Sequence, residues 1–174
     1  AAEKRVKTRV QRDKGKYDYD LFGRDTFEYF PLQLGNGDYK VTIYENIEGT
    51  RYRVAKSQNI KANLENPLKV FLASIQTVNW NQDMKTIKKA EEITKGLKTD
   101  REKIDAIYRF VVDNFSYDYD KIKNVPSTHV PDIDEILKAG KGICYDYSAV
   151  FAAMLRSQGI PCKLIKGYTT YVKG

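Results

Sequence analysis

The chain has 174 residues, of which 41% are hydrophobic, so it can bury the core of one large or two small domains. No apolar run approaches the length of about 18 residues that a transmembrane helix needs, and the polar residues 1–16 show no signal-peptide pattern. The net charge of +7 is concentrated in residues 1–16, and because no aromatic residues interleave with these basic side chains, we expect no nucleic-acid partner.

Residues 1–16 carry seven Lys or Arg residues against two acidic ones. Val6, Thr8 and Val10 alternate with basic residues, which predicts a solvated basic tail or the first, edge strand of a sheet. The alternative is an arm that contacts an anionic partner such as a cell-wall polymer or a lipid.

Residues 17–80 predict a small antiparallel β unit. Around Val41, hydrophobic and polar residues alternate with the period of two that is typical of a half-buried strand, and turn-forming residues lie at 36–38 and 46–50. We expect roughly three to five strands. A unit of this length buries little core by itself, so we expect it to pack on the residues that follow.

From Asp83 onward the hydrophobic period changes to that of helices. A first helix is predicted to end near Gly96. Thr99 and Glu102 then have the spacing of a capping box, which predicts the start of a second helix. A short helix is expected at 132–139.

The last predicted helix opens at Cys144 and is apolar on nearly every face, which is typical of a helix buried in a core. Gly159 suits the left-handed conformation that ends many helices, and Pro161 prevents the helix from continuing. Residues 162–168 are predicted to form the first strand of a second sheet.

Cys144 and Cys162 are the two cysteines of the chain. If the helix that opens at Cys144 forms, it separates them by roughly 20 Å, whereas a disulfide needs Cα atoms within about 7 Å. We therefore predict two free thiols. No cofactor and no metal is expected, because Asp118 and Asp120 lack the spaced acidic loop of a calcium site.

Cys144 combines several features of a nucleophile. The helix dipole and the unpaired amides at a helix N-terminus favour a thiolate, and the same amides can donate to an oxyanion. Gly140 and Gly142 would let a substrate backbone approach closely. The alternative is that Cys144 is a small buried hydrophobic residue, as free cysteines often are.

The segment GKGICYDYSAVFAAMLRSQGIPCKLIKGY, residues 140–168, resembles the cysteine segment of the transglutaminase-like superfamily. The shared pattern is Gly-x-Cys at a helix start, Met-Leu-Arg near its end, and Gly-Ile-Pro before a strand that ends Gly-Tyr. Upstream, IYRFVVDNFSYDYD is similar to a helix-and-tyrosine segment of the same family, so the resemblance covers about residues 99–174. Residues 17–80 are similar, more weakly, to the accessory half of its bacterial secreted members.

This resemblance implies an α+β protein in which a small antiparallel β unit packs on a papain-like core. The predicted organisation is a basic tail or edge strand at 1–16, a β unit at 17–80 and a partial transglutaminase-like core at 81–174. The resemblance also implies that Cys144 attacks a protein or peptide amide, forms a thioester and releases an amine or ammonia. An extracellular or cell-envelope location is expected from the family resemblance alone, and cell-wall material is a candidate partner of the basic tail or the β unit. The rival interpretation is a non-catalytic envelope interaction module or pseudoenzyme.

The histidine and aspartate of this family follow the cysteine along the chain, but His129 precedes Cys144 and is the only histidine. We expect either a fragment that ends before these residues or a pseudoenzyme, with an incomplete C-terminal sheet and absent or impaired activity. The strand at 162–168 would then expose an apolar edge, which a dimer would cover.

His129 and Tyr145 are the remaining site candidates. His129 is interpreted as an exposed loop residue, as a hydrogen-bond donor over the cleft, or as the base in a different geometry. Tyr145 flanks the nucleophile and either lines the cleft, as an oxyanion candidate, or packs in the core.

Overall fold

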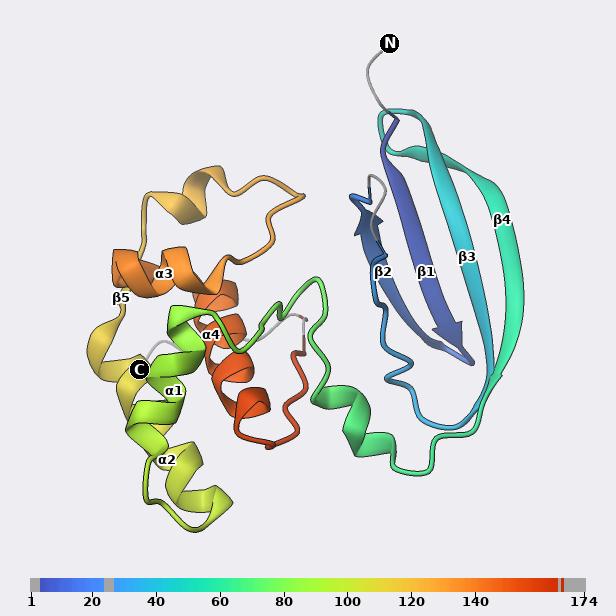
Figure 1. The fold of residues 1–174 in the computed structure, drawn as a ribbon. Coiled ribbons are helices and arrows are strands. Elements are labelled where there is room, and N and C mark those ends of the chain that lie inside the picture. The colour runs from blue at the N-terminus through green and yellow to red at the C-terminus, as the bar shows by residue number, and fades with distance from the viewer. Residues whose placement is uncertain (1–3, 24–26, 166, 168–174) are drawn as a thin grey trace. The chain divides into compact units, whose positions relative to one another are not determined.

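The computed structural model has the α+β class that the sequence predicts. It describes residues 4–23, 27–165 and 167. The long strands lie in the first part of the chain and the α-helices in the second (Figure 1). Within the described residues, no helix has both the length and the apolar composition that crossing a membrane requires.

The chain divides into two compact units. Unit 1 comprises the described residues up to Gln76 and the separate segment 126–130. Unit 2 comprises 77–125 and the described residues from Pro131 onward. The segment 126–130 therefore groups with unit 1 although the residues on both sides of it belong to unit 2.

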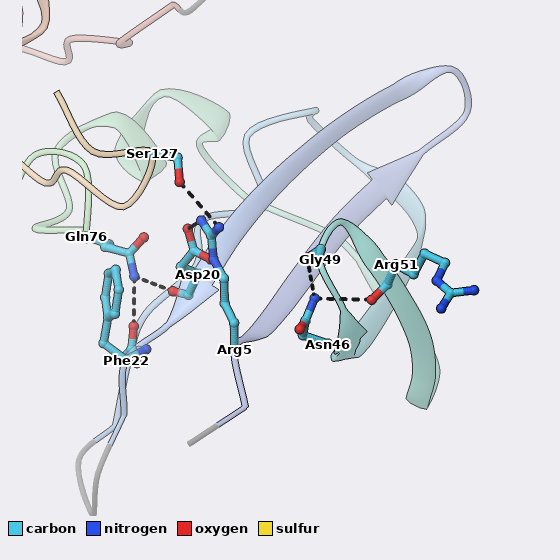
Figure 2. A network of polar contacts seen from close by, with 9 residues as sticks. Arg5, Asp20, Phe22, Asn46, Gly49, Arg51, Gln76 and Ser127 are labelled. Atoms are coloured by element: carbon cyan, nitrogen blue, oxygen red, sulfur yellow. Dashed lines mark hydrogen bonds and ion pairs between the residues drawn. The ribbon is translucent and has the colours of Figure 1, made fainter. Parts of the chain in front are cut away.

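Unit 1 contains a four-stranded antiparallel sheet with the order β2-β1-β3-β4. Its strands are β1 (Val6–Arg12), β2 (Gly15–Leu21), β3 (Gly37–Glu48) and β4 (Arg51–Ala62), and a short 3-10 helix, η1 (Pro67–Phe71), follows. At the β3–β4 turn, the side-chain amide of Asn46 donates to the carbonyls of Gly49 at 2.8 Å and Arg51 at 3.2 Å (Figure 2). This side chain fixes the turn that joins the two longest strands.

Strand β1 lies between β2 and β3, whereas the sequence predicted a tail or an edge strand at residues 1–16. Its basic side chains pair with carboxylates of β2. Arg9 donates to Asp18 at 2.6 and 2.8 Å, and Arg5, just before β1, donates to Asp20 at 2.5 and 2.7 Å (Figure 2). The positive charge of residues 1–16 predicted a segment exposed to solvent. The neighbouring strand β2 supplies acidic partners for these basic side chains, so β1 lies inside the sheet.

Residues 30–34, which lie between β2 and β3, pack on one face of the sheet. The core of unit 1 consists of Val10, Tyr19, Tyr39 and Ala62, with Tyr17, Phe30, Leu32, Leu34 and Ile60 packed against it. The Tyr39 hydroxyl accepts from the Leu34 N–H at 3.0 Å and donates to the Gly35 carbonyl at 2.6 Å. The buried tyrosine thus fastens the covering loop to the sheet.

Unit 2 is built around one buried helix, α4 (Cys144–Ser157). This helix contacts α1 (Lys85–Thr94), α2 (Asp100–Asn114) and α3 (Ile133–Ala139). Its buried residues are Asp146, Ala149, Val150, Ala152, Ala153, Met154, Leu155 and Arg156. The prediction of a helix buried on most of its faces is confirmed.

The predicted helix ends are also confirmed. At the start of α2, the Glu102 N–H donates to the Thr99 hydroxyl at 3.2 Å, and the Thr99 N–H donates to the Glu102 carboxylate at 2.9 Å, as a capping box requires. After α4, Gly159 is left-handed (φ 78°) and its N–H donates to the Arg156 carbonyl at 3.0 Å.

The strand predicted at 162–168 is not found in the described residues of that segment. Arg156 holds the segment instead, because its guanidinium donates to the Cys162 carbonyl from Nε at 3.0 Å and from Nη2 at 2.7 Å. A strand needs a neighbouring strand to pair with, and none pairs with these described residues. The remainder of the segment lies outside the described residues.

Candidate active site

Cys144 is the first residue of α4, and its side chain is exposed while most of the helix is buried. The helix begins after Ile143, which has extended backbone angles (φ −99°, ψ 172°) and provides no side-chain cap. The N–H groups of the first helical turn have no partner within the helix. The thiol therefore lies at a helix end that favours negative charge and offers hydrogen-bond donors.

Asp146 is fully buried in the first turn of the same helix. Its Oδ2 atom accepts from the Ile143 N–H at 2.9 Å and from the Lys121 ammonium at 2.6 Å. Lys121 opens a short 3-10 helix, η2 (Lys121–Asn124). This pair is not predictable from the sequence, because 25 residues separate the partners and no local pattern connects them.

A pair of short parallel strands, called the ladder below, fixes the main chain that leads to Cys144. Strand β5 (Ser116–Tyr117) pairs with β6 (Lys141–Gly142), through bonds from the Ser116 N–H to the Gly140 carbonyl at 3.0 Å and from the Asp118 N–H to the Gly142 carbonyl at 2.8 Å. Gly140 is left-handed (φ 61°) and ends α3. The ladder therefore joins the end of α2 to the residues that precede the thiol.

Gly142 has a local structural reason to be glycine. A Cβ atom at this position would lie 2.8 Å from the Cβ of Asp146 and 2.9 Å from its Oδ2. Gly142 was predicted to let a substrate approach closely, but the contact with Asp146 explains this glycine without a substrate.

Aromatic rings surround the ladder. The ring of Tyr117 lies 5.0 Å from that of Tyr119 and 6.3 Å from that of Tyr147, and Phe115 lies 5.9 Å from Tyr147. Partial desolvation, followed by the negative charge of the Cys144 thiolate, raises the pKa of Tyr117. Tyr117 thus belongs to the site, although it was not among the predicted site residues. The sequence feature that could have indicated it is the alternation of aromatic and acidic residues in FSYDYD.

Asp118 contributes a second carboxylate near the ladder. It accepts from the Lys121 N–H at 2.9 Å and lies 3.3 Å from the Lys141 ammonium. The Lys121 N–H and the Lys141 ammonium hold the pKa of Asp118 below its usual value. Among the described residues, no group of three or more His, Cys, Asp or Glu side chains is arranged to hold a metal ion.

Tyr145, predicted as a cleft or oxyanion candidate, is half-buried next to the thiol. Burial, and secondarily the charge of Asp146, raise the pKa of its hydroxyl to about 12. The hydroxyl therefore remains protonated at neutral pH and keeps its ability to donate. Its role toward an oxyanion stays a prediction.

His129, the other candidate, lies in the loop segment 126–130 that groups with unit 1, whereas Cys144 belongs to unit 2. Its N–H donates to the Pro126 carbonyl at 2.9 Å. In the same segment, the Ser127 hydroxyl accepts from the Arg5 guanidinium at 3.4 Å (Figure 2). The three roles considered for His129 all stay predictions.

Both cysteines are free, as predicted, but they differ in environment. Cys144 is exposed and Cys162 is half-buried. Burial raises the pKa of the Cys162 thiol, an effect that the nearby Arg156 cation partly opposes. Cys162 is therefore the less reactive thiol by environment.

A family model of the transglutaminase-like superfamily matches residues 87–173. The match contains the ladder, Lys121, Asp146 and Cys144. The chain belongs to the transglutaminase-like superfamily. Searches of curated proteins and of solved structures gave no significant match.

Proposed function

We propose that the protein is a cysteine enzyme that acts on protein or peptide amides through a thioester at Cys144. The observation that carries the proposal is an exposed thiol at the first position of a mostly buried helix. Membership in the transglutaminase-like superfamily, whose members are generally cysteine enzymes, supports the class of chemistry.

In the proposed reaction, the Cys144 thiolate attacks the amide carbonyl carbon, and a C–S bond forms as the C–N bond breaks. The leaving nitrogen takes up a proton and departs as an amine or ammonia. Water then releases a carboxylic acid, or a primary amine forms a new amide, and the thiol is regenerated. The N–H groups in the first turn of α4, which have no acceptor within the helix, support this proposal, because they point to where the oxyanion would develop.

The proposal requires a general base as well as a nucleophile. His129 is the only histidine of the sequence, and its segment groups with the other unit. The proposed base is therefore His129 or a group outside these 174 residues, and activity is absent or impaired where neither reaches the thiol. An extracellular or cell-envelope location is part of the proposal, supported by the resemblance of the N-terminal β unit to bacterial secreted members.

Incorporation of monodansylcadaverine into casein, measured together with ammonia release, tests the proposal. The assay is run with and without imidazole, which can replace an absent histidine base. We expect product that disappears in Cys144→Ala and persists in Cys162→Ser. Equal signals for the parent protein and Cys144→Ala under both conditions would reject the enzymatic proposal and favour the interaction module.

A further inference from the structure

We infer that Lys121 and Asp146 are positioning residues for Cys144 and act through the main chain at Ile143. This inference rests on the proposed function, because it assigns the pair a role in presenting the nucleophile. The Asp146 side chain is fully buried, and the Lys121 side chain is 32% exposed.

Lys121 and Asp146 close a ring of polar contacts. The Gly142 carbonyl accepts from the Asp118 N–H at 2.8 Å, and the Asp118 carboxylate accepts from the Lys121 N–H at 2.9 Å. The Lys121 ammonium donates to Asp146 at 2.6 Å, and Asp146 accepts from the Ile143 N–H at 2.9 Å. Because Ile143 follows Gly142 in the chain, the ring returns to the residues that immediately precede Cys144.

The Asp146 carboxylate also packs tightly against the main chain before Cys144. Gly142 leaves no room for a Cβ atom against Asp146, at 2.8 Å, so the carboxylate and the main chain before Cys144 are in close contact. The buried carboxylate accepts from both the Lys121 ammonium and the Ile143 N–H, and these two bonds fix the direction in which α4 starts. The sulfur, as part of the next residue, takes its position from this start.

The Lys121–Asp146 pair also sets the charge near the thiol. Asp146 is buried only two positions after Cys144, and an uncompensated carboxylate there would disfavour a thiolate. The Lys121 ammonium offsets that charge at 2.6 Å. Among the described residues, the ionisable groups near the pair or the thiol include the neutral tyrosines Tyr117, Tyr145 and Tyr147 and the Asp118–Lys141 ion pair. Lys121 therefore contributes a positive charge that offsets the Asp146 carboxylate close to the thiol.

The test compares the alkylation rate of Cys144 with iodoacetamide between variants in a Cys162→Ser background, from pH 6 to pH 9. Lys121→Met removes the ammonium and keeps an apolar stem, and Lys121→Arg keeps the charge. Lys123→Met is the matched control, because Lys123 lies in the same 3-10 helix but pairs with the exposed Asp120 at 3.2 Å. Circular dichroism verifies that each variant is folded.

We expect Lys121→Met to slow alkylation at pH 7 by about tenfold, with the difference shrinking as the pH rises and the thiolate forms anyway. Lys121→Arg and Lys123→Met should stay within about threefold of the parent. The double variant Lys121→Met/Asp146→Asn should recover most of the loss, because Asn keeps an acceptor for the Ile143 N–H but removes the carboxylate charge.

The outcomes separate this inference from the proposed function. An alkylation rate for Lys121→Met equal to that of Lys123→Met, in a protein whose Cys144 does react, overturns the inference and leaves the nucleophile intact. A double variant that is slower than Lys121→Met also overturns the electrostatic role, since a purely structural role predicts added damage. A parent Cys144 that reacts no faster than a model thiol rejects the proposed function itself.

Discussion

Asp134, in the first turn of α3, caps the start of a different helix. Its carboxylate accepts from the Thr86 N–H at 2.8 Å, from the Thr86 hydroxyl at 2.8 Å and from the Lys85 N–H at 3.0 Å. The N-cap residue of α1, Met84, has no side-chain acceptor to serve this purpose. One short helix therefore completes the hydrogen bonds of another across 48 residues of sequence.

Replacing Asp134 with Ala should lower the free energy of unfolding by about 1 kcal/mol, as expected for loss of a helix cap. Urea denaturation followed by circular dichroism measures this change. Glu135→Ala is the matched control, because Glu135 is exposed in the same helical turn and pairs only at the surface with Lys138. Equal effects of the two substitutions would show that the Asp134 cap adds no stability.

The same residue predicts a pH dependence. Burial acts to raise the pKa of Asp134, but the hydrogen bonds from Thr86 and Lys85 outweigh it, so the folded pKa is lowered. The carboxylate therefore contributes its full stabilisation above the pKa of about 4 that it has in the unfolded chain. This stabilisation is lost as the pH falls through the lower pKa of the folded state. The Asp134→Ala protein should lose less stability on acidification than the parent, measured by urea midpoints from pH 6 to pH 2.

The two thiols should react at different rates. Iodoacetamide at pH 7.5 is expected to modify Cys144 about tenfold faster than Cys162, because Cys162 is half-buried and its pKa is raised. The difference should narrow at higher pH, where Cys162 also ionises. Peptide mass spectrometry over a time course measures both rates, and labelling of Cys162 first would contradict the environments described above.

Gly142→Ala should disturb the start of α4. The new Cβ would lie 2.8 Å from the Asp146 Cβ, and an overlap of this kind in a packed site costs about 1–3 kcal/mol. We expect a lower unfolding free energy together with a changed alkylation rate at Cys144. Gly167→Ala is the comparison, because a Cβ there meets nothing within 4 Å; similar behaviour of the two variants would mean that Asp146 moves aside without cost.

Tyr39→Phe tests the covering loop of unit 1. The lost hydroxyl leaves the Leu34 N–H and the Gly35 carbonyl without this partner, which should cost about 1–3 kcal/mol. Tyr29→Phe is the control, since Tyr29 is 74% exposed. Thermal unfolding of both variants gives the comparison, and a melting temperature of Tyr39→Phe equal to that of Tyr29→Phe would count against the fastening role.

Sequence reasoning succeeded where the signal was local. The capping box of Thr99 and Glu102, the left-handed Gly159 and the apolar helix after Cys144 each follow from residues within a few positions of one another. These features depend on short-range hydrogen bonds and on hydrophobic period, which a single sequence displays directly.

Sequence reasoning failed where a partner came from elsewhere in the chain. Lys121 and Asp146 gave no common pattern, and the basic residues of β1 looked unpaired because their acids lie in the next strand. Tyr117 lies at the site because strand β5 pairs with β6, which brings it opposite Gly142. In each case the pairing depends on which segments the fold brings together, and composition does not determine this.

The grouping of 126–130 with unit 1 means that the chain passes between the units at three points rather than one. A single proteolytic cut near Gln76 would therefore not separate the two units cleanly, because Ser127 would still be held by Arg5. A recombinant piece beginning at Thr77 would carry this segment without Arg5, to which Ser127 is hydrogen-bonded. Any dissection of the protein into its halves has to treat residues 126–130 as belonging to the half that comes first in the sequence.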